Sequence, residues 1–319
     1  MFEILRKSLS TGVVTTSYPD TPAEVSNRAR GRPEIDWPNW KDARPATAIC
    51  PTGAIRYEDH NGQRTAKLDL AKCIFCGLCA DVDKAIRMTN DCECAARQRD
   101  DLVTSATYSL KSDGTHRDLV GSPFPLNGER AGVRGESNHR PIISPSPHPA
   151  LSPPSVSGEG TGSPRRDIDA LGEQLGERIH KIFGRSLHIR EVDAGSCNGC
   201  EIEIVGLNSP VYDIERFGIH FVASPRNADM LLVTGPVTRN MELALRKTYD
   251  AMPAPRLVVA VGACGCSGGI FGVNYASVGG VDQVLPVDVF IPGCPPNPHA
   301  LLHGILTAMG KLAAALAST

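Results

Sequence analysis

The residues best suited to chemistry in this sequence are its 11 cysteines. They form two groups, with none between Cys94 and Cys197. The sequence starts without the apolar stretch and cleavage site of an export signal and without a twin-arginine motif, which predicts a cytoplasmic chain. Because disulfides are rare in the reducing cytoplasm, so many thiols predict metal binding or redox chemistry. Two groups in two halves predict two metal modules.

The elements that must position the second group alternate between strands and helices. Apolar periodicity predicts helices at 240–252 and 298–316, and another at 168–184 that begins after Asp167. This alternation predicts an α/β domain with a doubly wound, flavodoxin-like parallel sheet. The predicted buried strands are residues 187–193, 230–235, 257–264 and 287–294.

In such a sheet, the cysteines of the second group lie where ligands bind. Cys197 and Cys200 follow the first strand, Cys264 ends the third and Cys294 ends the fourth. Loops at the carboxyl edge of a parallel sheet converge on one crevice, so four thiolates can enclose one cluster there. Cys266 is the alternative to Cys264 as a ligand. The position of Cys264 at the end of the third predicted strand favours Cys264. Zinc would use the same four thiolates, and a redox dithiol would leave Cys264 and Cys294 unexplained.

The first group has the spacing of an iron–sulfur run. In two-cluster ferredoxins, each C-x₂-C-x₂-C-x₃-C-P run gives its fourth cysteine to the other cluster. Here Asp83 stands where that fourth cysteine would be, and only Cys50-Pro51 is left of the other run. This segment resembles a bacterial-type ferredoxin, a small α+β domain with its core at 43–89, reduced to one 4Fe–4S site. The spacing disfavours a zinc knob. The four remaining ligands are Cys50, Cys73, Cys76 and Cys79.

Three segments of the second half resemble a known family. They are "GSCNGCEIEIVGLNSPVYDIERFGIHFVASPRNADMLLVTGPVTRN", "VVAVGACGCSGGIFG" and "FIPGCPPNP". They are similar to the small subunit of membrane-bound, formate hydrogenlyase-type (group 4) nickel–iron hydrogenases, which are related to the 20 kDa, B-type subunit of respiratory complex I. The resemblance covers Leu187 to the end. It implies one 4Fe–4S cluster on Cys197, Cys200, Cys264 and Cys294, next to the large subunit's active site.

The resemblance implies a function as an electron relay. The chain would pass electrons from a ferredoxin or formate dehydrogenase donor, through two 4Fe–4S clusters, to a nickel–iron hydrogenase-type large subunit that holds the nickel. Integral membrane subunits would keep it on the cytoplasmic face of the inner membrane. Complex I subunits have two adjacent cysteines where this chain has the spaced Cys197 and Cys200, which favours the hydrogenase branch. The alternatives are a complex I-like, quinone-reducing subunit and a zinc-stabilised scaffold without redox function.

Length and composition fit this organisation. A chain of 319 residues is expected to hold about two domains. The 46 residues from Gly121 to Arg166 include nine Pro and seven Gly. This share of Pro and Gly exceeds the roughly 25–30% that marks disordered sequence. We therefore predict a ferredoxin-type domain at 1–115, a disordered linker at 116–166 and a hydrogenase-type domain at 167–319. A net charge of -2 without a basic block excludes nucleic acid as the expected partner.

Several other residues have two interpretations. Glu201 either relays protons near the cluster or is a favourable charge at a helix N-terminus, and both interpretations stay open. For Glu203, the helix N-terminus is favoured. His299 and His303 have metalloprotease spacing but lack the glutamate base, which favours surface or interface positions. The glycines at 262–269 have the wrong spacing for a dinucleotide loop. Cys92 and Cys94 are interpreted as free thiols.

Overall fold

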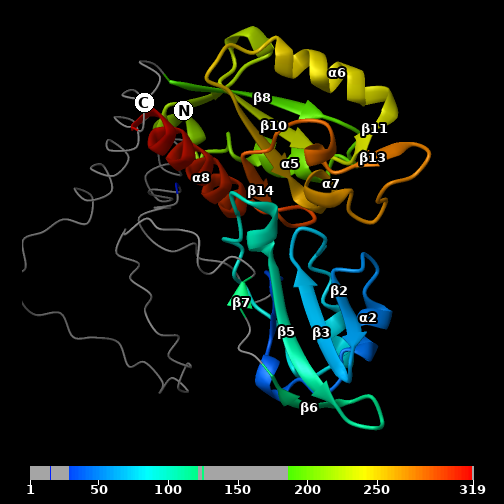
Figure 1. The fold of residues 1–319 in the computed structure, drawn as a ribbon. Helices are drawn as coiled ribbons and strands as arrows, with labels where there is room; N and C mark the ends of the chain where they lie inside the picture. The colour runs from blue at the N-terminus through cyan, green and yellow to red at the C-terminus, as the bar shows by residue number, and fades with distance from the viewer. Residues whose placement is uncertain (1–14, 16–28, 121–123, 126–185, 318–319) are drawn as a thin grey trace, which may run out of the picture.

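The computed structural model describes residue 15 and residues 29–120, 124–125 and 186–317. The described residues form two stacked domains, with the C-terminal domain above the N-terminal domain in Figure 1. The predicted helix at 168–184 and most of the predicted linker at 116–166 lie outside the described residues.

The C-terminal domain is built on a five-stranded sheet in which all neighbouring strands are parallel. By position in the chain, the strand order is 2-1-3-4-5, the order of flavodoxin-like sheets. The predicted α/β, doubly wound class therefore describes this domain. One edge strand, β9, is not among the predicted strands. From one edge to the other, the strands are β14 (Val289–Ile291), β12 (Leu257–Val261), β10 (Met230–Thr234), β8 (Leu187–Asp193) and β9 (Ile219–Phe221).

Helices cover both faces of this sheet, which explains why its strands β10 and β12 are buried and apolar along nearly their whole length. Along β10, Met230 and Leu232 join one buried cluster, and Leu231 and Val233 join the other. Helices α5 (Gly199–Gly206) and α8 (Pro298–Ala317) pack on the first face, and α6 (Arg239–Asp250) and α7 (Gly262–Ser267) on the second. None of the helices in the described residues is long and apolar enough to cross a bilayer.

Smaller elements complete the C-terminal domain. Strands β11 (Val237–Thr238) and β13 (Ser277–Gly279) form a separate antiparallel pair. The short 3₁₀ helices are η3 (Ile214–Phe217), η4 (Pro225–Asn227) and η5 (Val281–Gln283).

The third predicted strand is shorter than the sequence suggested. The prediction placed Cys264 within a strand at 257–264, but β12 ends at Val261 and α7 begins at Gly262. Gly262 has a φ of +78°, a backbone conformation that turns the chain out of the sheet and that side chains disfavour. Cys264 therefore lies in a short helix that directly follows the strand.

The N-terminal domain combines antiparallel strands with two short helices, α2 (Arg44–Ile49) and α3 (Leu78–Val82), and is of the α+β type. Its sheet extends beyond the predicted core at 43–89 and includes residues 116–119, which the sequence had placed in the linker. The main sheet contains β2 (Ile55–His60), β3 (Gln63–Asp69), β5 (Val103–Leu110), β6 (His116–Leu119) and β7 (Phe124–Pro125), and a separate pair contains β1 (Pro33–Ile35) and β4 (Ile86–Met88). The 3₁₀ helices are η1 (Trp37–Asn39) and η2 (Arg99–Leu102).

The buried core is continuous between the two domains. Trp40 packs edge-on against Tyr108 and His116 in the N-terminal domain. The same buried cluster contains Phe290 and Cys266 of the C-terminal domain. The two domains therefore share apolar contacts rather than meeting only through polar surfaces.

Candidate metal centres

Four of the predicted cysteine ligands lie at the carboxyl ends of the parallel strands. Cys197 and Cys200 follow β8, and Cys200 lies in the first turn of α5. Cys264 lies in α7 after β12, and Cys294 follows β14. Cys197 and Cys294 are exposed, whereas Cys200 and Cys264 are partly buried. The fold thus brings thiols from three connections to one edge of the sheet.

These four thiols are close enough to influence one another. Burial, followed by the neighbouring thiols of Cys294 and Cys197, raises the pKa of Cys264 to about 11. Burial and then Glu201 raise the pKa of Cys200, with smaller contributions from the other three thiols. The chain alone therefore keeps the thiols of Cys200 and Cys264 protonated near neutral pH. A bound metal would reverse this, because a coordinating thiol is deprotonated.

Two glycines leave room beside the sulfur atoms. A Cβ atom added to Gly262 would lie 2.8 Å from Sγ of Cys200. A Cβ atom added to Gly269 would lie 2.7 Å from Sγ of Cys264. Both distances are too short for real Cβ contacts, so these positions tolerate only glycine without movement of the thiols.

An aspartate that the sequence analysis did not single out holds the first cysteine loop. Asp193, the last residue of β8, accepts hydrogen bonds at Oδ1 from the backbone N–H groups of Gly195 (2.7 Å) and Ser196 (2.6 Å). The Oγ atom of Ser196 then accepts from the N–H of Asn198 at 3.0 Å. The signal in the sequence was an Asp at a strand end followed closely by Gly and Ser, a typical turn pattern.

Cys266 is separated from the other thiols. It is fully buried, and its Sγ lies 3.6 Å from the carbonyl of Ala260 and 3.5 Å from that of Ile291. Burial raises the pKa of the Cys266 thiol, which is therefore a neutral group in the core. The structure brings Cys264, and not Cys266, together with Cys197, Cys200 and Cys294.

The acidic residues after Cys200 differ in position. Glu201 lies in the first turn of α5, and both of its carboxylate oxygens are buried without a hydrogen-bond partner among the described residues. Glu203 lies beyond that first turn, and burial raises its pKa. The interpretation of Glu203 as a favourable charge at the helix N-terminus is therefore wrong, because the residue at that position is Glu201.

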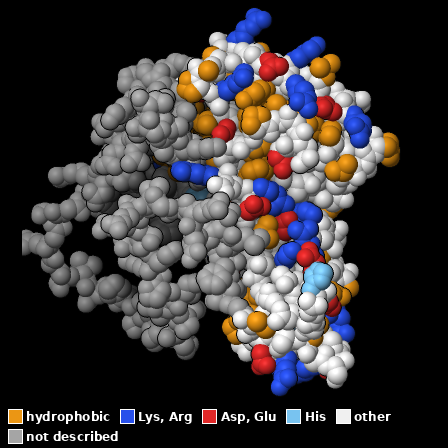
Figure 2. All heavy atoms as spheres, viewed as in Figure 1, with side chains coloured by type: hydrophobic (Ala, Val, Ile, Leu, Met, Phe, Trp, Pro, Cys, Tyr) orange, Lys and Arg blue, Asp and Glu red, His pale blue; other side chains and the backbone are white. Residues whose placement is uncertain are grey.

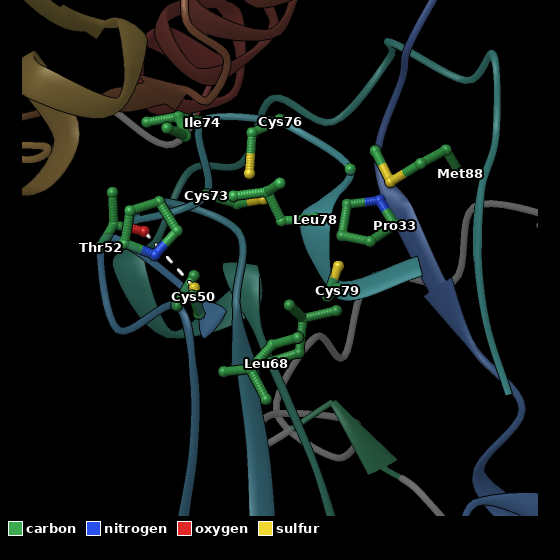
Figure 3. Close-up of a pocket in the computed structure, with 14 residues that line it drawn as sticks. Pro33, Cys50, Thr52, Leu68, Cys73, Ile74, Cys76, Leu78, Cys79 and Met88 are labelled. Carbon is green, nitrogen blue, oxygen red and sulfur yellow. Dashed lines mark hydrogen bonds between the residues drawn. The ribbon is translucent and has the colours of Figure 1, made fainter. Parts of the chain in front are cut away.

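Four cysteines of the N-terminal domain surround one pocket (Figure 3). Cys50 directly follows α2, Cys73 and Cys76 lie in the loop after β3, and Cys79 lies in α3. The remaining pocket wall is mostly apolar and includes Pro33, Leu68, Ile74, Leu78 and Met88. Figure 3 shows the side chains of all four cysteines around this space.

Two of the pocket thiols, Cys73 and Cys79, are buried away from water. Burial raises the pKa of Cys73 to about 12, although the backbone N–H of Phe75 donates to its Sγ at 3.4 Å and partly offsets the shift. Burial also raises the pKa of Cys79 to about 11. Sγ of Cys50 lies 3.8 Å from the hydroxyl of Thr52. A backbone donor beside a sulfur is a feature that stabilises negative charge on a thiolate.

The residue in place of the missing ferredoxin cysteine has a structural role. Asp83 accepts a hydrogen bond from Nε1 of Trp40 at 2.7 Å and another from the backbone N–H of Ala85 at 2.9 Å. It is not among the pocket residues. Asp83 thus anchors the core tryptophan at the end of α3.

The remaining predicted candidates lie outside both sites. Cys92 is buried in the core of the C-terminal domain, and burial raises the pKa of Cys94 to about 12. His299 is 8% exposed and lies edge-on to Tyr212, so it is not a surface residue.

Within the described residues, no three His, Cys, Asp or Glu side chains are placed around a single metal ion. A 4Fe–4S cluster is held by four cysteine thiolates around a group of several atoms, which is a different arrangement.

Comparisons with known proteins place the C-terminal site in a family. Residues 197–308 match the family described as NADH ubiquinone oxidoreductase, 20 Kd subunit. The match begins at Cys197 and includes all four thiols of the C-terminal site. A probable membrane-bound hydrogenase subunit, mbhJ, of Pyrococcus furiosus is 49% identical over 136 residues, which are 43% of this chain and 81% of that protein. The chain therefore belongs to the family of the NADH ubiquinone oxidoreductase 20 Kd subunit.

Other relatives come from two kinds of enzyme complex. Formate hydrogenlyase subunit 7 of Escherichia coli is 52% identical over 145 residues, 46% of this chain and 57% of that protein. The B-type subunit of the NADH-quinone oxidoreductase of Citrifermentans bemidjiense is 50% identical over 114 residues, 36% of this chain and 66% of that protein. The matched region is thus a little over half of one relative and about two thirds of the other. The chain is a subunit of an oxidoreductase complex of the hydrogenase and NADH-quinone oxidoreductase type.

Proposed function

We propose that this chain is the electron-transfer subunit of a formate hydrogenlyase-type nickel–iron hydrogenase complex. It would hold two 4Fe–4S clusters and relay electrons from an upstream donor to the hydrogenase large subunit. The observation that carries this proposal is the grouping of eight thiols into two separate sets of four, one in each domain. Each bound cluster would supply one-electron redox chemistry.

The residues of the C-terminal site fit a cluster. Cys197, Cys200, Cys264 and Cys294 supply the thiolate count of a 4Fe–4S cluster. Gly262 and Gly269 keep side chains away from the sulfur atoms, and Asp193 holds the loop that carries Cys197. The chain's contribution is to position the ligands and to limit access of water to Cys200 and Cys264.

The residues of the N-terminal site fit a second cluster. Cys50, Cys73, Cys76 and Cys79 line one pocket with apolar walls. Support for a degenerate ferredoxin domain comes from the retained C-x₂-C-x₂-C run and from Asp83, which binds Trp40 instead of lining the pocket. We therefore propose a fusion of a one-cluster ferredoxin domain with a hydrogenase-type small subunit, joined by a linker within 116–166.

The surface beside the C-terminal site suits a large partner subunit. Apolar side chains are exposed on α5, which begins two residues after Cys197, and on the loop that follows α7, the helix of Cys264. That loop projects at the right of Figure 1, and Figure 2 shows hydrophobic side chains at the same edge. Large exposed apolar patches mark protein interaction sites. The exposed residues are Ile202, Val205, Ile270, Phe271, Val273 and Tyr275.

We propose that this surface binds a nickel–iron hydrogenase-type large subunit. The donor would be a ferredoxin or a formate dehydrogenase, and integral membrane subunits would hold the chain at the cytoplasmic face of the inner membrane. Support comes from the relatives, whose names place them in membrane-bound hydrogenase and formate hydrogenlyase. Glu201, buried beside Cys200 without a hydrogen-bond partner among the described residues, is a candidate for proton relay at this interface.

The main alternative is a quinone-reducing complex. It is favoured by the similarity to the B-type subunit of NADH-quinone oxidoreductase. The test is purification of the native complex with an affinity tag on this chain, followed by metal analysis and sequencing of the bound subunits. We expect nickel and a large subunit with two paired-cysteine motifs. A large subunit without these motifs, in a complex without nickel but with quinone reductase activity, would contradict the hydrogenase assignment.

A further inference from the structure

The chain segment that enters the N-terminal site touches the helix that carries Cys264. The carbonyl of Ala71, two positions before Cys73, accepts a hydrogen bond from Oγ of Ser267 at 3.0 Å. Ser267 is the last residue of α7, three positions after Cys264. This contact therefore joins a ligand-bearing segment of one domain directly to a ligand-bearing helix of the other.

The segment before Cys73 is itself tightly held. The N–H of Ala71 donates to Oδ1 of Asp69 at 3.1 Å, and the N–H of Lys72 donates to the Asp69 carbonyl at 3.1 Å. The N–H of Cys73 donates to the carbonyl of Leu70 at 3.1 Å. A displacement of Ala71 would therefore be passed on to the backbone of Cys73.

An ion pair fixes the same segment at the domain boundary. Arg99 binds both carboxylate oxygens of Asp69, at 2.8 and 2.7 Å, and Asp69 is only 2% exposed. Cys266 and Asp282 of the C-terminal domain lie close enough to Arg99 to affect its pKa. We call Asp69, Ala71, Arg99 and Ser267 the junction.

The hydroxyl of Ser267 is shared between the two domains. It lies 2.9 Å from the carbonyl of Ala263 in its own helix, as well as 3.0 Å from that of Ala71. A hydroxyl has one proton, so it divides this donor between the two carbonyls. The N–H of Gly269 approaches the same oxygen at 3.4 Å. The side chain thus sits between the end of α7 and the Cys73 segment.

We propose that Ser267 is a positioning residue that holds the two cysteine sites in a fixed relation through the junction. If the sites hold clusters, as the proposed function requires, the junction fixes the distance between them. Electron transfer slows steeply with distance, so this contact would set how fast electrons cross from one domain to the other. The positioning of the Cys73 segment by Ser267 is a property of the chain alone and does not depend on which metal the thiols bind.

Hydrogen exchange in the full-length protein tests whether Ser267 holds the segment before Cys73 in place. In Ser267→Ala, we expect the amides of Ala71, Lys72 and Cys73 to exchange about fivefold faster, the effect of losing one hydrogen bond of ~1 kcal/mol. Ser267→Thr keeps the hydroxyl and should restore slow exchange. Thr248→Ala is the matched control, because Thr248 donates at 2.8 Å only to Ala244 in its own helix.

The outcomes are distinct. Unchanged exchange at residues 71–73 in Ser267→Ala, or an equal change in Thr248→Ala, would overturn the proposed role of Ser267. In the iron-loaded protein, we also expect Ser267→Ala to slow electron transfer between the two sites after photoreduction, with unchanged reduction potentials and rescue by Ser267→Thr. An unchanged transfer rate together with faster exchange would refute control of the rate by the junction. Absence of iron in the wild type would instead refute the proposed function and leave the exchange result standing.

Discussion

Ala96 and Phe290 pair across the two domains as an antiparallel β-bridge. The N–H of Ala96 donates to the carbonyl of Phe290 at 3.0 Å, and the N–H of Phe290 donates to that of Ala96 at 2.8 Å. Next to this bridge, Cys92 of the N-terminal half is buried in the core of the C-terminal domain. The two halves are thus joined by backbone pairing and apolar burial as well as by the chain between them.

From this pairing, we predict that the halves stay together when the chain is cut. A protease site placed within residues 126–185 would leave both pieces in one complex, because described residues on either side of the cut hold the two halves together. Size-exclusion chromatography after cleavage should give a single peak with both pieces. Ala96→Pro removes the donating N–H and should weaken the complex. Separation of the wild-type pieces at micromolar concentration would contradict this prediction.

Gly262→Ala should damage the C-terminal site alone. The added Cβ would lie 2.8 Å from Sγ of Cys200, on a backbone with φ of +78°. We expect the variant to lose about half of its iron, the share of one of two clusters. Gly272→Ala is the control, since Gly272 also has a positive φ, +57°, but nothing lies within 4 Å of an added Cβ. Equal iron contents in the two variants would argue against crowding of Cys200.

Much of the fold could be predicted from the sequence, because the strands of a sheet covered on both faces are apolar throughout. This holds for β10, β12 and β14, whereas β8 also carries His188, Arg190 and Glu191. All four strands match the predicted ones apart from their ends. The edge strand β9 was missed because Ile219–Phe221 is short and contains a histidine. The helical turn of Cys264 was missed because a run of Gly, Ala, Cys and Ser has no clear period.

The grouping of the thiols could be predicted from the spacing of the cysteines in the sequence, whereas the roles of the neighbouring residues could not. Asp83 was recognised as standing in place of a ligand, but its bond to Trp40 depends on a residue 43 positions away. The burial of Cys92 and the contact of Ser267 with Ala71 likewise depend on how the domains pack. Such contacts carry no local sequence signal.

Arg99→Ala should destabilise the chain strongly. It would leave the carboxylate of Asp69, 2% exposed, without its cation. Such a loss costs about 3–5 kcal/mol when both partners are buried, and we expect less here because the Arg99 side chain is 24% exposed. Arg246→Ala is the comparison, because its pair with Glu242 at 3.1 Å is solvent-exposed and contributes about 0.3–0.5 kcal/mol. Urea unfolding of both variants measures the difference. Similar midpoints would show that the Asp69 pair contributes little.

Stability should fall in mild acid because of His116. Burial lowers the pKa of His116 below its ordinary value of 6.5, while its Nδ1 lies 2.9 Å from the carbonyl of Trp40. As the pH falls, His116 therefore becomes protonated at a higher pH in the unfolded chain than in the folded chain. The stability contribution is complete above about pH 6.5 and is lost progressively below it. The melting temperature should start to drop as the pH falls through about 6.5, the ordinary pKa of histidine.

The slope of this pH dependence should be smaller in His116→Phe than in the wild type. His60→Phe, a change at an exposed position in β2, should keep the wild-type slope. Equal slopes in all three proteins would exclude His116 as the responsible group.

The most direct test of the two-cluster relay is iron and acid-labile sulfide analysis with EPR on the anaerobically purified, reduced protein. We predict about eight iron atoms per chain, with about half lost in Cys197→Ser and the other half lost in Cys76→Ser. Cys94→Ser, which changes a thiol outside both sites, should keep the full content. Zinc in place of iron in the wild type, or an iron content that neither site variant lowers, would contradict the two-cluster relay.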